Sequence, residues 1–86
     1  MISRGRPSFW QLYHKLPRHV RQQAQEVHKL FLKDPGHPSL RFKKLSGGGD
    51  FWSVRVNEQY RVVGLRSGEL IEWFWIGTHN DFDKSF

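Results

Sequence analysis

The sequence of 86 residues has no cysteine, no long apolar run and few acidic residues. Without cysteine, it can form neither a disulfide framework nor a metal site with thiolate ligands. No stretch approaches the roughly 20 apolar residues that span a membrane, and the first ten residues lack the apolar segment of a signal peptide. We therefore expect a soluble cytoplasmic protein that does not insert into membranes.

Basic residues outnumber acidic ones, with 14 Lys and Arg against 8 Asp and Glu and a net charge of +6. Such a charge attracts polyanions, among them nucleic acid, acidic proteins and anionic membranes. The alternative is a surface that only keeps the protein soluble. The length suits one domain and is too short for two, so we expect a single domain over residues 1–86.

Apolar residues between positions 8 and 33 recur at spacings of three and four, as on one face of an α-helix. Pro17 interrupts the stripe, and proline suits the first turn of a helix but not its interior. The pattern predicts two helices, over residues 8–16 and 17–33, that form a hairpin. Residues 1–7 show no periodicity and are predicted to be a flexible arm.

After Pro38 the apolar period changes to two, which is typical of β-strands. The pattern predicts strands over residues 51–57, 60–66 and 70–76, and a further short strand near residues 40–45. Short turns between the last three strands imply antiparallel hairpins. The fold class expected is α+β, with the N-terminal helical hairpin packed on a small antiparallel sheet of three to four strands.

Basic side chains interrupt the predicted strands. Arg55 and Arg61 flank one hairpin turn, and both are expected on the sheet face that the helices leave open. Arg41, Lys43 and Lys44 lead into the same region. Fixed cations on an open sheet face can bind phosphate, which arginine contacts through two parallel hydrogen bonds. Alternatively, these charges are solvated and only discourage pairing at the sheet edge.

The sequence has no metalloprotease, phosphate-loop or serine-hydrolase motif. Its five histidines lie too far apart for metal-ligand spacing, so no metal site is expected. His79 follows the last apolar strand, next to the expected cationic face. A histidine there can transfer protons near neutral pH, or it can serve as a polar loop residue that caps nearby backbone groups.

The order of these features resembles the RelE/ParE superfamily of bacterial toxins. The resemblance covers residues 8–84 and consists of a helical hairpin, then HPSLRFKKL, then FWSVRVNEQYRVVG, then WFWIGTHNDFDK. It is closest to the RelE and YafQ branches. Those branches imply a type II toxin that inhibits translation by cleaving messenger RNA in the ribosomal A site, and that a cognate antitoxin neutralises. They also imply that no metal or small-molecule cofactor takes part.

The resemblance implies roles for single residues. Arg61 matches a phosphate-binding arginine, and His79 matches the terminal general acid or base of the YafQ-like branch. Arg55 and Lys43 fall near basic positions of the preceding strands. Phe82 falls near a C-terminal aromatic that is tyrosine in some relatives, and without a hydroxyl it can stack on a base but cannot transfer a proton.

Two alternatives to a ribonuclease stay open, since Phe82 departs from the family pattern and no alternating strand opens the sequence. The ParE branch shares the fold but inhibits DNA gyrase without catalysis, so fold alone does not decide the function. A degenerate, non-toxic relative that still binds RNA is the second alternative. In every case residues 70–76, apolar on both faces, are expected to leave an exposed patch for an acidic or amphipathic antitoxin segment.

Overall fold

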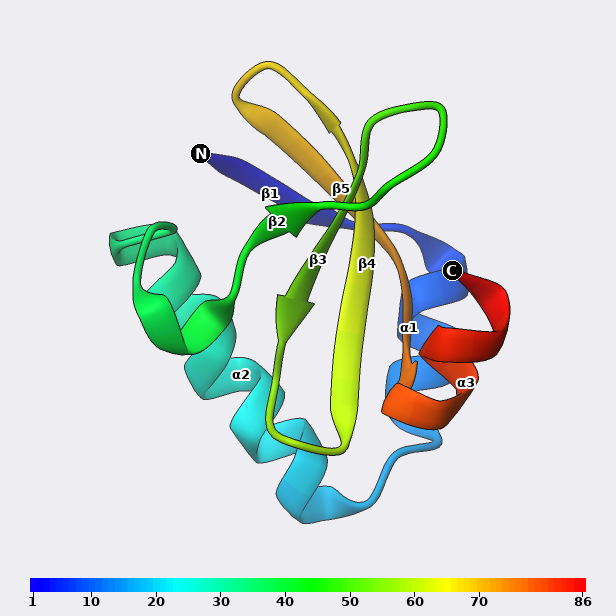
Figure 1. Ribbon diagram of the computed structural model, residues 1–86. Helices are drawn as coiled ribbons and strands as arrows, with labels where there is room; N and C mark the ends of the chain where they lie inside the picture. The colour runs from blue at the N-terminus through cyan, green and yellow to red at the C-terminus, as the bar shows by residue number, and fades with distance from the viewer.

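The apolar stripe near the start of the sequence forms the two predicted helices. α1 (Pro7–His14) and α2 (Arg18–Lys33) lie on either side of Pro17. Proline has a fixed φ angle and no amide hydrogen, so it fits directly before a helix, where that hydrogen would have no intrahelical partner. The computed structural model describes residues 1–86 and shows both helices beside one sheet (Figure 1).

The sheet has five strands in the order β1-β5-β4-β3-β2. Their bounds are β1 (Ile2–Gly5), β2 (Lys43–Lys44), β3 (Phe51–Arg55), β4 (Tyr60–Ser67) and β5 (Leu70–Thr78). Strands β2 to β5 pair antiparallel, whereas β1 pairs parallel with β5. The predicted α+β fold with a helical hairpin on a largely antiparallel sheet is confirmed, and the sheet is wider than the three to four strands expected.

The first residues of the chain form β1, so the prediction of a flexible arm over residues 1–7 is wrong, as is the expected absence of a first strand. The Ile2 amide donates to the Glu69 carbonyl at 2.7 Å, and the Arg6 amide donates to the Trp73 carbonyl at 2.8 Å. Backbone groups make this pairing, and Ile2 is 60% exposed. Because the side chains of such an edge strand need not be buried, its sequence shows no alternation of apolar and polar residues.

The end of the chain forms a third helix, α3 (His79–Ser85), which the sequence pattern does not predict. Thr78 caps it, because its hydroxyl oxygen accepts a hydrogen bond from the Asp81 amide at 3.2 Å. Threonine followed three positions later by an acidic residue is a known helix-start signal. None of the three helices is long and apolar enough to cross a membrane.

The helices cover the two faces of the sheet unequally. The main core lies on the face that carries α1 and α2, where Phe31, Leu40, Ile71 and Ile76 are each at most 1% exposed. α3 packs on the other face, and Figure 1 shows α2 and α3 on opposite sides of β3 and β4. The second face therefore has only one short helix to cover its apolar side chains.

A β-bulge in β5 places two large aromatic residues on the second face. Val63 lies opposite Trp75 and Gly64 opposite Trp73, so Phe74 between them has no partner on β4. Trp73 enters the main core and is 7% exposed, whereas Phe74 and Trp75 are half-buried on the α3 side. The apolar patch expected on this strand is therefore partly covered by the chain's own C-terminal helix.

Candidate functional site

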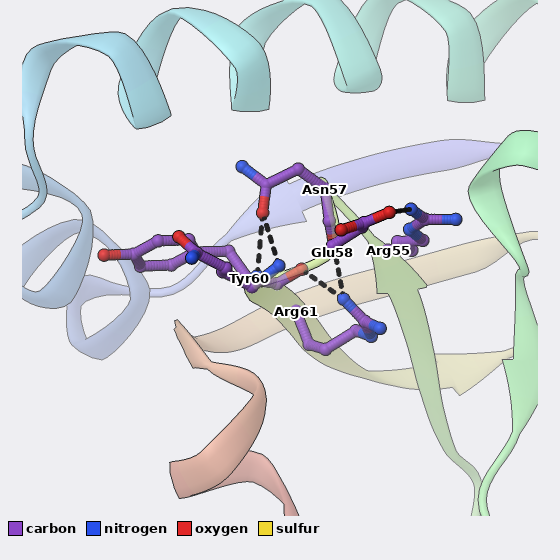
Figure 2. A network of polar contacts seen from close by, with 6 residues as sticks. Arg55, Asn57, Glu58, Tyr60 and Arg61 are labelled. Carbon is purple, nitrogen blue, oxygen red and sulfur yellow. Dashed lines mark hydrogen bonds and ion pairs between the residues drawn. The ribbon is translucent and has the colours of Figure 1, made fainter.

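The turn between β3 and β4 is held in place by the side chain of Asn57. Its carbonyl oxygen accepts hydrogen bonds from the amides of Gln59, at 2.7 Å, and Tyr60, at 3.0 Å (Figure 2). Its amide nitrogen donates to the Gln23 side chain of α2 at 2.6 Å. Asparagine readily bonds to the backbone two residues ahead in this way. The turn is thus fixed both internally and to a helix.

Arg61 folds back over this turn. One terminal nitrogen of its guanidinium donates to the carbonyls of Asn57 and Tyr60, the latter at 3.0 Å, as Figure 2 shows. These bonds leave the other terminal nitrogen and Nε available for a ligand. Burial lowers the pKa of Arg61, Arg55 and Arg41 lower it further, and Asp83 opposes them. The guanidinium stays charged in spite of this, since arginine does not deprotonate in proteins.

Arg55 lies directly opposite Arg61 in the pairing of β3 with β4. Its guanidinium is 3.9 Å from the carboxylate of Glu58, which is itself 91% exposed. Arg41 belongs to the same group electrostatically and has an unusual left-handed backbone, with φ of 47°. Like charges placed opposite one another destabilise a sheet. This arrangement is relieved when an anion binds between the arginines.

His79 reaches the same turn from α3. Its backbone amide donates to the Gln59 carbonyl at 2.6 Å, so the first residue of α3 is tied to the turn that holds Arg61. Its Nε2 lies 3.3 Å from a carboxylate oxygen of Asp83, one helical turn later. The Phe82 ring lies nearly parallel to the imidazole, at 6.2 Å between centroids. The imidazole is 46% exposed and open to a ligand.

The structure brings together most of the residues singled out from the sequence. Arg41, Arg55, Arg61, His79 and Phe82 surround the β3–β4 turn and α3. Lys43 pairs with Ser53, which places it on the Arg55 face at the edge of the sheet. Lys44 is set apart: it pairs with Trp52 on the opposite face, and its ammonium lies 3.6 Å from the Asp50 carboxylate.

Asp83 is the residue that sequence reasoning misses. Its carboxylate lies 3.3 Å from Nε2 of His79, and it partly opposes the burial and the neighbouring arginines that lower the pKa of Arg61. Residues four apart face each other only on a helix. The pair could have been found had the Thr78–Asp81 capping signal been used to predict α3.

The arrangement has the groups needed to act on a phosphodiester. Arginines can hold the phosphate and stabilise negative charge that develops on it. A half-exposed histidine can donate or accept a proton near neutral pH. No three His, Asp or Glu side chains gather in a geometry that could hold a metal ion.

Comparison with known proteins gives one family and a consistent fold. The family model of the ParE-like toxin domain matches residues 18–84. The toxin–antitoxin complex RelB-RelE from Methanococcus jannaschii has a TM-score of 0.76 at 17% identity, covering 96% of this chain and 98% of that one. YafQ from Escherichia coli has a TM-score of 0.74 at 9% identity, covering 93% and 94%. The YoeB/ParE toxin from Agrobacterium tumefaciens gives 0.69 at 19% identity, covering 92% and 99%.

At such identities the structural likeness shows the fold alone. A search of curated proteins found no match.

Proposed function

The chain belongs to the family of ParE-like toxin domains, within the RelE/ParE superfamily, and we propose that it is a type II toxin that cleaves messenger RNA on the ribosome. The observation that carries the proposal is the joining of Arg61 and His79 at one rigid turn. Arg61 bonds to the Asn57 carbonyl, and His79 bonds through its amide to the Gln59 carbonyl. A non-catalytic inhibitor has no need for this pairing of a phosphate ligand with a proton carrier.

The reaction proposed is attack of a ribose 2′-OH on the adjacent phosphate, with loss of the 5′-oxygen of the next nucleotide. Arg61 and Arg55 hold the phosphate and stabilise the added charge of the transition state. His79 moves a proton to or from one of the reacting oxygens. Phe82, beside His79, offers a surface on which a base can stack. No metal or other cofactor enters this scheme, and the reaction takes place in the cytoplasm, where translating ribosomes are.

Asp83 positions His79 in this scheme. Since Nε2 of His79 faces the Asp83 carboxylate at 3.3 Å, Nε2 carries the proton and Nδ1 is free to act on the substrate. The same carboxylate partly opposes the lowering of the Arg61 pKa by burial and by the neighbouring arginines.

The partners proposed are messenger RNA in the ribosomal A site and a cognate antitoxin. The Methanococcus jannaschii and Pyrococcus horikoshii relatives are each described as complexes of RelE with RelB. By analogy, an acidic or amphipathic antitoxin segment covers the Arg41, Arg55 and Arg61 face of this chain. Lys43 lies at the edge of that face and would extend the same contact.

The second candidate function is inhibition of a protein such as DNA gyrase, without catalysis. The description of the matching family favours it, as does Phe82, which has no hydroxyl for proton transfer. A degenerate relative that binds RNA without toxicity would keep the arginines and need no His79.

Induced expression separates these functions. We expect growth arrest together with new messenger RNA ends inside reading frames, each carrying a 5′-hydroxyl, because 2′-OH attack leaves that group on the downstream fragment. The control is the same induction with co-expression of the cognate antitoxin, which should prevent the arrest. Growth arrest with intact messenger RNA and an induced DNA-damage response would instead support the gyrase inhibitor, and normal growth would support the degenerate relative.

A further inference from the structure

A second concave site lies on the other side of the sheet from Arg61 and His79. It is a pocket of about 170 Å³ between α1, α2, β1 and the sheet. Its floor consists of Val54, Val56 and Val62, all at most 9% exposed, with Phe31 at the side. Its mouth is formed by exposed side chains of the two helices, Trp10, Gln25 and His28.

The pocket is uncharged throughout. No Lys, Arg, Asp or Glu contributes to its lining, although these residues make up 26% of the chain. His28 is the only titratable side chain of the lining, and its partial burial at the mouth lowers its pKa, which favours the neutral imidazole at pH 7 and above. A charged ligand would lose hydration without meeting an opposite charge, which is strongly unfavourable.

The polar side chains of the lining are few, and Ser3, Gln25 and His28 supply them together with the Trp indoles. Ser3 of β1 is central, because its hydroxyl oxygen accepts from the Trp73 indole at 2.7 Å and lies 3.1 Å from Nε2 of His28. Gln25, a lining residue, donates its amide hydrogen to the Tyr13 hydroxyl at 2.7 Å, and its carbonyl oxygen has no hydrogen bond in the structure. A ligand that carries one hydrogen-bond donor can use that oxygen.

The volume corresponds to one aromatic ring or two fused rings. A cavity of roughly 150 Å³ lined by aliphatic and aromatic side chains stays dry and binds benzene. Interiors are normally packed with few voids larger than a water molecule. An apolar void of this size lowers stability until something fills it, so a ligand of the right shape gains affinity by restoring contacts.

We propose that this pocket binds a small uncharged aromatic molecule with a single hydrogen-bond donor, such as a phenol or an indole. The ring packs on Val54, Val62 and Phe31, and the donor meets Gln25 at the mouth. Trp10 is 45% exposed and is held over the mouth by a hydrogen bond from its indole to the Gly5 carbonyl at 3.2 Å. A bound ring would contact residues of α1, α2 and β1 at once. The proposal does not depend on the reaction that the opposite face performs.

The test uses 4-fluorophenol with the whole chain, observed by fluorine and methyl NMR. We expect saturable binding, with contacts between the ring protons and the methyl groups of Val54 and Val62. Val63 is the internal control, because it is fully buried but does not line the pocket. 4-Fluorobenzoate at pH 7.5 should bind at least tenfold more weakly, since its carboxylate is charged.

Two matched variants of α2 complete the test. Ala24→Leu fills the pocket and should abolish binding of 4-fluorophenol, whereas Gln22→Leu adds the same side chain at an exposed position outside the pocket and should leave it unchanged. Absence of saturable binding up to millimolar concentration would overturn the proposal, as would ring contacts to Val63 or equal binding by folded Ala24→Leu. If Ala24→Leu does not fold, the methyl contacts in the wild-type chain decide alone.

Discussion

The two faces of the sheet are built from the same strands but differ in what holds their side chains. On the face of α1 and α2, ten buried residues form one apolar cluster, and no ion pair is needed to order it. On the face of α3, three arginines and a histidine lie beside half-buried aromatic residues. Hydrogen bonds to the backbone of one turn position Arg61 and the first residue of α3, His79. The first face therefore provides most of the stability. The second face can carry arginines that repel one another without loss of the fold.

The glycines of the two faces show the same difference. A Cβ at Gly64 would lie 2.6 Å from the Trp73 ring, 2.9 Å from Ile71 and 3.0 Å from the Glu72 carbonyl, so backbone would have to move. The three atoms nearest to a Cβ at Gly77 all belong to the Trp75 ring, the closest at 2.6 Å. That ring packs on Phe82 and Phe86 of the C-terminal segment, which can shift.

The largest effect on stability is expected for Phe31→Ala on the first face. Phe31 is 1% exposed and packs edge-on against Trp73 and Phe42. Its truncation should lower the free energy of unfolding by about 3–5 kcal/mol. Phe82→Ala, the matched change on the second face, should cost much less because Phe82 is only half-buried. Urea unfolding measures both, and equal losses would remove the distinction between the faces.

The next largest effect is expected on activity. Arg61→Ala should lower the rate of messenger RNA cleavage on the order of 10²–10³-fold, as for loss of a group that stabilises a transition-state oxyanion. Arg61→Lys should recover only part of it, because an ammonium cannot replace the planar fork. Lys44→Ala is the control, since Lys44 lies on the opposite face. A cleavage assay on programmed ribosomes measures all three, and a larger loss for Lys44→Ala would place the site elsewhere.

Gly64→Ala and Gly77→Ala compare the rigidity of the two faces directly. Gly64→Ala should lower the free energy of unfolding by about 1–3 kcal/mol, the usual range for overpacking. Gly77→Ala should cost less and should instead raise amide exchange in α3, because the Trp75 ring moves and loosens Phe82. Hydrogen exchange and thermal unfolding provide the readouts. Greater destabilisation by Gly77→Ala would show that α3 is as rigid as the core.

The smallest effect is a pH dependence at His28. Burial lowers its pKa in the folded chain, whereas in the unfolded chain it is about 6.5. Well above pH 6.5 His28 is neutral in both states, and stability does not depend on its protonation. As the pH falls below that value, the unfolded state takes up the proton more readily, so stability declines. His28→Gln should reduce this decline, while His19→Gln, exposed on the same helix, should keep the wild-type slope between pH 7.5 and 5.

Sequence periodicity predicts the elements that bury one apolar face and fails for those held by other forces. α1, α2 and the β3–β5 meander follow from apolar spacing and short turns. Periodicity does not predict β1, because β1 is an edge strand whose partner, β5, lies near the other end of the chain. Periodicity does not predict α3 either, because the helix is short and has no buried residue. Its only sequence signal is the Thr78 cap.

The candidate site was predictable in its residue types but not in its geometry. Arg61 and Arg55 are on neighbouring strands of a short hairpin, so their proximity follows from the sequence. The contact of His79 with the turn depends on one backbone hydrogen bond to Gln59, which no side-chain pattern encodes. Asp83 becomes visible only once α3 is known.

The central claim, that His79 moves a proton in RNA cleavage, is tested most directly by comparing the wild-type and His79→Ala chains in cleavage on programmed ribosomes. The wild-type chain should produce fragments that end in a 2′,3′-cyclic phosphate. His79→Ala should lower the cleavage rate on the order of 10²–10⁴-fold, because the proton carrier is lost. Circular dichroism and antitoxin binding should remain those of the wild type. A folded His79→Ala variant that cleaves at the wild-type rate, or fragments that end in a free 3′-hydroxyl, would contradict the account.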